Sequence, residues 1–140
     1  MARNVHIALV AVPGVLLSER ARRADGSTEA ILLRDGVVTE GAASNVFIVS
    51  AGEVRTPAKS SFLLPGVTRD LVVELLRGAD IDCVEATISE QELRGAEEIW
   101  LTSSTMGIAP VTRLDGKPIG DGRPGRAWQA ADRIYQDYKL

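Results

Sequence analysis

The chain has 140 residues, 45% of them hydrophobic and 25% charged, which is the size and composition of one globular domain. Its net charge of -3 gives no electrostatic basis for binding nucleic acid or an anionic membrane, and no apolar stretch is long enough to span a bilayer. A single cysteine, Cys83, excludes an internal disulfide, and together with a single histidine, His6, it argues against a zinc site. We therefore expect a cytoplasmic protein.

The first half of the chain is predicted to be mostly strands. Val5 to Val12 is interpreted as a buried first strand rather than a signal peptide, because a histidine interrupts the apolar run and no small-residue cleavage site follows it. A helix is expected over 14–24. Two hairpins follow, which turn at Asp35-Gly36 and at Ala51-Gly52, because such two-residue turns between apolar runs are typical of hairpins.

The second half alternates helices with strands. Apolar residues recur at helical spacing from Leu71 to Leu76, and Gly78 is predicted to end that helix. Ser89 is predicted to cap a short helix. The other expected elements are strands over 83–89 and 97–104, a hairpin turning at Asp115-Gly116 and a helix within 123–140. The fold class is therefore α/β (α+β), with many short, largely antiparallel strands in a single domain, 1–140.

The segment "LPGVTRDLV", residues 64–72, is a candidate phosphate site. Pro65-Gly66 predicts a turn, after which Val67, Thr68 and Arg69 open a helix. A helix N-terminus exposes unpaired N–H groups and the positive end of the helix dipole, and it therefore attracts anions. The simpler alternative is that Thr68 only caps the helix.

Hydroxyl side chains are concentrated in "LTSSTMGIAP", residues 101–110. Thr102, Ser103, Ser104 and Thr105 directly follow an apolar strand. Consecutive backbone N–H groups in such a turn are able to bind an anion. An ordinary polar loop explains the same composition.

Glu40 precedes a run of small residues and then the apolar strand that begins near Val46. Most glutamates in hairpins are solvated and have no further role. A carboxylate is also the group that keeps a pyridinium nitrogen protonated, so that the ring accepts electrons from an attached amino acid. The small residues Gly41 to Ala43 would let a flat ring approach the backbone.

Three segments occur in a recognisable order: "EGAASNVFIV", "LPGVTRDLV" and "LTSSTMGIAPVTRLDG". This order closely resembles the class IV (fold type IV) pyridoxal-phosphate aminotransferases, a group that includes D-amino acid and branched-chain aminotransferases and aminodeoxychorismate lyase. The resemblance runs from about Pro13 to the C-terminus, and the last residues look most like D-amino acid aminotransferases. It implies the larger, C-terminal domain of the D-amino acid aminotransferase-like fold, a mixed, largely antiparallel sheet or pseudo-barrel with flanking helices. The family's N-terminal domain is expected to be absent.

The resemblance also implies roles for residues that match the family's motifs. Glu40 would pair with the pyridine nitrogen of pyridoxal 5'-phosphate. Val67 and Thr68 would hold the phosphate through their backbone amides and the threonine hydroxyl. The complete set of implied cofactor-binding residues is Glu40, Ser44, Asn45, Val67, Thr68, Ser103, Ser104 and Thr105.

The Schiff-base lysine of the family has no counterpart in this sequence. In the family it binds the cofactor and carries the proton between two carbon atoms. Its position falls at Ile7 when the alignment passes through Pro13, and at Ala8 when it is counted back from Glu40. The lysines that the chain does contain are Lys59, Lys117 and Lys139, and we expect none of them to replace it.

Three interpretations remain open, of which the simplest is an α/β domain unrelated to the family; the other two follow from the resemblance. The chain resembles an aminotransferase that moves an amino group between an amino acid, D-alanine-like or branched-chain, and a 2-oxo acid. Alternatively, it is an inactive fragment or split-subunit module that retains the fold, with weak cofactor or phosphate binding or an association role. In either case we expect a homo-oligomer or a separate N-terminal subunit as partner.

Overall fold

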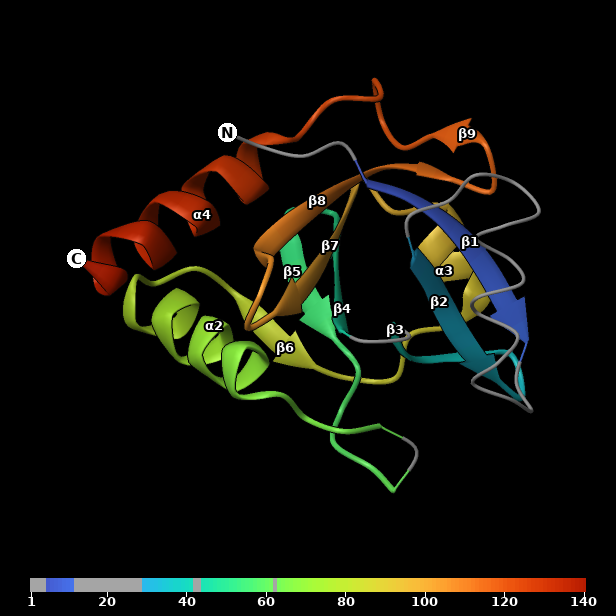
Figure 1. The fold of residues 1–140 in the computed structure, drawn as a ribbon, viewed down its shortest axis with the longest axis horizontal. Helices are drawn as coiled ribbons and strands as arrows, with labels where there is room; N and C mark the ends of the chain where they lie inside the picture. The colour runs from blue at the N-terminus through green and yellow to red at the C-terminus, as the bar shows by residue number, and fades with distance from the viewer. Residues whose placement is uncertain (1–4, 12–28, 42–43, 62) are drawn as a thin grey trace.

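A computed structural model describes residues 5–11, 29–41, 44–61 and 63–140 (Figure 1). The helix expected over 14–24 lies outside these residues. The described elements are β1 Val5–Ala11, β2 Glu29–Arg34, β3 Val37–Gly41, β4 Asn45–Ser50, β5 Glu53–Thr56, α2 Val67–Gly78, β6 Cys83–Glu85, α3 Glu90–Arg94, β7 Glu98–Ser103, β8 Gly107–Leu114, β9 Lys117–Pro118 and α4 Arg126–Lys139.

The strands form one mixed sheet in the order β3-β2-β1-β8-β7-β4-β5-β6, with β9 paired to β8. β1 pairs in parallel with β2 and β8, and β5 pairs in parallel with β6. The other described pairs are antiparallel. The predicted mixed, largely antiparallel sheet with flanking helices is therefore confirmed.

The three predicted hairpin turns all form. In each, both central residues have positive φ: 53° and 75° at Asp35-Gly36, 50° and 77° at Ala51-Gly52, and 51° and 78° at Asp115-Gly116. Such turns match the right-handed twist of the flanking strands, and glycine takes the second position without strain. Local turn chemistry therefore sets the register of β2 on β3, β4 on β5 and β8 on β9.

Two predicted boundaries differ from the structure. Gly78 is the last residue of α2 rather than the residue that stops it. The chain leaves the helix two residues later, where Asp80 takes the left-handed conformation, with φ 59°. The Ile81 N–H then donates to the Leu76 carbonyl at 2.9 Å. The strand predicted over 83–89 ends at Glu85, because the described strand that pairs with β6 is the short strand β5.

The core has two layers, one on each face of the central strands. The sheet curls so that Ile31 and Val38 of the β2–β3 hairpin pack in one cluster with Ile48 and Leu101 of the central strands. On the other face α2 and α4 lie side by side and cover Phe47 and Trp100 (Figure 1).

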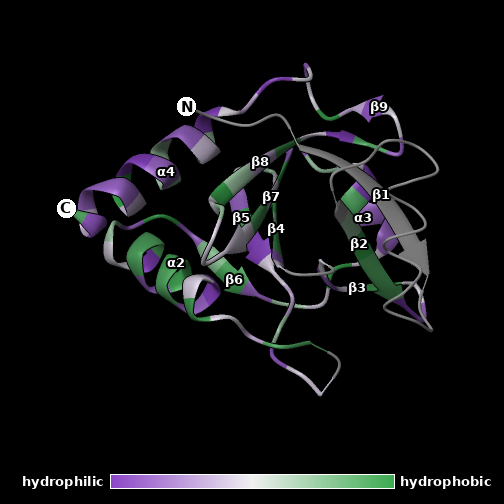
Figure 2. Cartoon of the chain, viewed as in Figure 1, coloured by the Kyte–Doolittle hydropathy of each residue, from purple (hydrophilic) through white to green (hydrophobic). Residues whose placement is uncertain are grey.

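The two long helices are amphipathic. Figure 2 shows α4 largely hydrophilic in colour, with its apolar residues limited to part of its surface. Ala131 and Tyr135 are its buried residues, and they pack against the sheet. None of the described helices is long and apolar enough to cross a membrane.

Candidate functional site

A pocket of about 400 Å³ lies where the end of β3, the start of β4, the start of α2 and the end of β7 meet. It brings together every residue implied by the family resemblance except Thr105. It is lined by Glu40, Ser44, Asn45, Leu64, Gly66, Val67, Thr68, Arg69, Thr102, Ser103 and Ser104. Segments that are distant in the sequence therefore form one site, and the cofactor role of each residue stays a prediction.

The loop before α2 is held by two of the predicted residues. The Glu40 Oε1 atom accepts a hydrogen bond from the Leu64 N–H at 3.0 Å. The Asn45 side chain donates to the Leu64 carbonyl at 3.0 Å through Nδ2 and accepts from the Gly66 N–H at 2.9 Å through Oδ1. Both backbone polar groups of Leu64 are thus satisfied by side chains, which fixes where α2 begins.

The N-terminus of α2 carries no side-chain cap. Its N-cap residue is Gly66, and Thr68 lies inside the first turn, so Thr68 is not the cap that its residue type suggested. By contrast, Ser89 and Glu92 form a capping box at α3. The Glu98 carboxylate accepts the Ala127 and Trp128 N–H groups in the first turn of α4. Among the described helices, α2 alone has an N-terminus that lines this pocket and that no side chain caps.

Arg69 is a buried cation beneath this helix end, and its side chain is 1% exposed. Its guanidinium donates to the Glu85 carboxylate at 2.7 Å, to the Asp70 carboxylate at 2.8 Å and to the Pro57 carbonyl at 2.9 Å. The hydrogen bond from Arg69 holds the pKa of Glu85 below its usual value. Arg69 therefore links α2, β6 and the segment after β5, a role that the sequence alone did not indicate.

The hydroxyl-rich segment covers the last two residues of β7, Thr102 and Ser103, and the start of the turn that leads into β8. The Ser103 Oγ atom accepts the Met106 N–H at 3.0 Å and lies 3.2 Å from the Thr105 Oγ1 atom. Thr105 is thus bound to the turn and does not line the pocket, whereas Ser103 and Ser104 do. The predicted anion-binding segment is ordered by its own hydroxyl groups.

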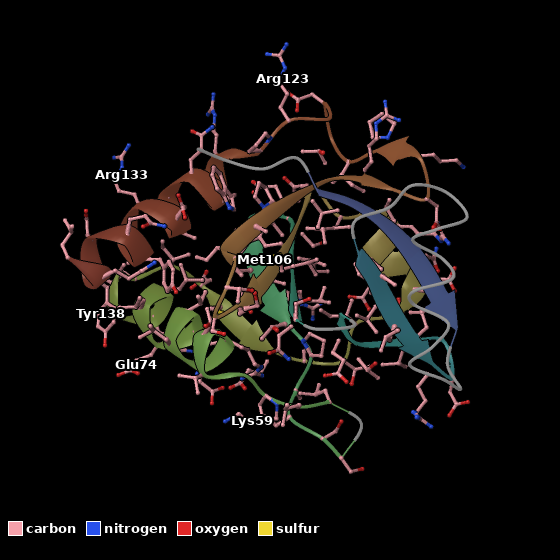
Figure 3. The ribbon with its side chains drawn as sticks, viewed as in Figure 1. Lys59, Glu74, Met106, Arg123, Arg133 and Tyr138 are labelled. Carbon is pink, nitrogen blue, oxygen red and sulfur yellow. The ribbon has the colours of Figure 1, made fainter. Side chains whose placement is uncertain are left out.

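No lysine is among the pocket's lining residues. Lys59 lies on the segment after β5, where its Nζ atom is 3.3 Å from the Asp70 Oδ2 atom (Figure 3). Lys117 belongs to β9, and Lys139 ends α4. The two positions considered for the family lysine lie in β1, where the backbones of Ile7 and Ala8 are paired with β2.

Comparison with known proteins identifies the family. A model described as amino-transferase class IV matches residues 7–114, more than half of the chain. The chain therefore belongs to the class IV aminotransferase family. D-alanine aminotransferase of Bacillus licheniformis is 38% identical over 111 residues, which cover 79% of this chain and 39% of that protein. A branched-chain-amino-acid aminotransferase of Salmonella typhimurium is 37% identical over 112 residues, which cover 79% of this chain and 36% of that protein.

Solved structures share the fold. An aminotransferase from Brucella abortus, bound to the cofactor PLP, superimposes with a TM-score of 0.87 at 26% identity and covers 99% of this chain. The branched-chain amino acid aminotransferase of Escherichia coli gives a TM-score of 0.83 at 29% identity over 97% of this chain. This chain spans 55% and 51% of those two chains, and a still smaller share of the curated relatives. The predicted aminotransferase fold and family are confirmed.

Proposed function

We propose that the pocket binds pyridoxal 5'-phosphate and that the chain is the cofactor-binding part of a class IV aminotransferase. One observation carries the proposal: an uncapped helix N-terminus and a carboxylate line the same pocket. The pocket suits a phosphate, because the uncapped N-terminus of α2 opens onto it. It also suits a basic ring nitrogen, because the Glu40 carboxylate lines the same pocket, where its Oε1 atom accepts the Leu64 N–H.

In this arrangement the chain's own residues bind and orient the cofactor. The amides of Val67 and Thr68, with the Thr68 hydroxyl, hold the phosphate, and Ser103 and Ser104 add polar contacts. Glu40 keeps the proton on the pyridine nitrogen. When bound, the cofactor supplies an electron-accepting ring for an attached amino acid. The bonds from Asn45 to the loop before α2 keep these groups in place.

We further propose that this chain by itself binds the cofactor without a covalent bond and does not complete amino-group transfer. The pocket lining contains no lysine, and only a lysine amine would join the cofactor and carry the proton. The parent activity would transfer an amino group between a D-alanine-like or branched-chain amino acid and a 2-oxo acid. The chain corresponds in this proposal to the family's larger C-terminal domain, acting in the cytoplasm.

An association role is the second candidate, and two exposed apolar side chains favour it. Leu64 is 78% exposed and Val67 is 86% exposed, and both line the pocket. Apolar side chains at a pocket mouth fit a covering protein surface. The partner would be a second copy of the chain or a separate N-terminal subunit. The mass of the native complex, measured with and without pyridoxal phosphate, tests this candidate.

The cofactor proposal is tested by titrating the protein with pyridoxal phosphate and following the absorbance of the cofactor. We expect saturable binding, and no covalent adduct after borohydride reduction and intact-mass measurement. Thr68→Ala and Glu40→Ala should each weaken binding by about tenfold or more, the value of one charge-assisted hydrogen bond. Thr87→Ala and Glu97→Ala, at exposed positions outside the pocket, are the matched controls.

Two results would contradict parts of the proposal. A stoichiometric adduct on one lysine, with turnover of D-alanine and 2-oxoglutarate, would show that the chain is an active enzyme. Absence of any binding would rule out the cofactor role and leave the association role as the better explanation.

A further inference from the structure

Thr102 has a buried hydroxyl that no described residue satisfies. The residue is 1% exposed, and its Oγ1 atom has no partner among the described residues. Burying an unpaired hydroxyl destabilises a folded protein, so such groups are uncommon in native structures. Valine has nearly the same shape and would fill the same position in a strand without this cost. Within the described part of the chain, the hydroxyl of Thr102 therefore makes no contact that would explain it by stability.

The position of Thr102 in the sheet explains why none of the described residues satisfies its hydroxyl. Thr102 lies in β7, directly across from Asn45 of β4 on one side and Ile108 of β8 on the other. Residues directly opposite each other in antiparallel strands project from the same face. The Asn45 amide is engaged by the loop before α2, and the Ile108 side chain has no polar atom. The neighbouring side chains thus leave the hydroxyl unpaired.

The same residue lines the pocket that the N-terminus of α2 opens onto. Two independent features, an uncapped helix end and an unpaired hydroxyl, therefore meet at one pocket from different elements of the fold. Oγ1 itself is covered in the described rotamer. Rotation about the Cα–Cβ bond exchanges the hydroxyl with the methyl group between staggered positions, and Thr populates more than one of them.

We propose that the Thr102 hydroxyl donates a hydrogen bond to a phosphate oxygen of the ligand bound at the N-terminus of α2. This inference rests on the proposed function, and it gives a specific role to Thr102, which lies in the hydroxyl-rich segment but is not among the cofactor-binding residues that the resemblance implies. The hydroxyl provides a donor from the sheet side of the pocket, whereas the amides of Val67 and Thr68 provide donors from the helix side. A donor left unpaired in the ligand-free protein becomes satisfied when the phosphate binds.

The proposal predicts opposite effects of one substitution on stability and on binding. Thr102→Val should leave the melting temperature of the ligand-free protein unchanged or raise it. The same substitution should weaken pyridoxal phosphate binding by about tenfold or more, since a hydrogen bond to a charged group is lost. Binding of inorganic phosphate should weaken in parallel, whereas binding of pyridoxal, which has no phosphate, should be unchanged. Thr102→Ser should restore binding.

Thr56 offers a matched control. It is also fully buried in a strand, but its hydroxyl donates to the Val46 carbonyl at 2.6 Å, and it does not line the pocket. Thr56→Val should lower the melting temperature and leave the affinity for pyridoxal phosphate unchanged. The pair of variants therefore separates a structural hydroxyl from one that serves a ligand.

The outcomes distinguish this inference from the proposed function. If the wild-type chain binds neither pyridoxal phosphate nor phosphate, both proposals fail. If the wild type binds and Thr102→Val binds equally well, only the role of Thr102 is overturned. A fall in melting temperature for Thr102→Val that matches that of Thr56→Val would show that the hydroxyl has a structural partner, and it would overturn the inference as well.

Discussion

Asn45 and Gly66 are in close contact at the start of α2. The Asn45 Oδ1 atom accepts the Gly66 N–H at 2.9 Å, and a Cβ atom at Gly66 would lie only 2.9 Å from the same oxygen. Gly66 has φ -70° and ψ 156°, which any residue adopts without strain. Glycine is thus required here for the close approach of the side-chain amide, not for its backbone angles.

Gly66→Ala should therefore displace the Asn45 amide from the loop. We expect a loss of about 1–3 kcal/mol in the free energy of unfolding, as for other substitutions that force atoms into packed space. Pyridoxal phosphate binding should weaken as well, because the amides of α2 shift. Urea denaturation and cofactor titration measure the two effects.

Gly78→Ala is the control for that substitution. A Cβ at Gly78 meets no atom within 4 Å, and the residue is helical. Alanine should stabilise the protein by up to about 1 kcal/mol, because it restricts the unfolded chain and favours the helix. Equal effects of the two alanines would contradict the role assigned to the Asn45 contact.

Arg69→Met should destabilise the protein by about 2 kcal/mol or more, because Glu85 and Asp70 lose their buried cation and the Pro57 carbonyl loses its donor. Arg77 also approaches Glu85, at 3.5 Å, but its side chain is 51% exposed. Arg77→Met should cost less than about 1 kcal/mol. Chemical denaturation of both variants tests the difference, and a similar loss in both would refute the importance of burial.

The bond from Arg69 to Glu85 predicts a dependence of stability on pH. Because this bond holds the folded-state pKa of Glu85 below the ordinary 4.5, the stabilisation is complete above the unfolded pKa and is lost as the pH falls through the folded pKa. The free energy of unfolding should therefore decrease below about pH 4.5. Glu85→Gln should be less stable at neutral pH and should lose less on acidification. Parallel curves for the two proteins would contradict this assignment.

Glu98→Ala should destabilise the start of α4. Its carboxylate accepts the Ala127 and Trp128 N–H groups, at 3.0 and 2.9 Å, and the Trp100 Nε1–H at 3.0 Å. Loss of this acceptor should cost about 1–3 kcal/mol and shift the tryptophan fluorescence. Glu97→Ala removes a neighbouring exposed carboxylate, whose only described hydrogen bond is at 3.4 Å from the Gly52 N–H, and should change neither quantity measurably.

Features that depend on a few neighbouring residues could be predicted from the sequence. The Asp35-Gly36 turn and the Ser89 cap follow from the preferences of adjacent residues, and both form. The predicted end of the strand that begins at Cys83 was wrong, because the length of a strand depends on its partner strand, and β5 is distant in the sequence. The order of the family's motifs predicts most of the residues that line the pocket.

Contacts between distant segments could not be predicted. Nothing near Arg69 in the sequence indicates that its charge is buried against Glu85, which belongs to another element. The unpaired hydroxyl of Thr102 likewise depends on which residues face it from β4 and β8. Thr105 was expected in the site, but its hydroxyl lies against Ser103 within the turn, outside the pocket lining.

Glu40 and Asn45 hold the loop before α2 and also line the pocket. This double role affects how active relatives of this chain can be distinguished from inactive ones. A descendant that had lost all chemistry would still benefit from these two residues, because their side chains satisfy backbone groups of the loop before α2. Their presence is therefore a poor criterion for distinguishing working enzymes from inactive ones. Thr102, whose hydroxyl costs stability when nothing is bound, is free to become valine once binding is no longer needed. Retention of a hydroxyl at this one position would be the better marker of a site still in use.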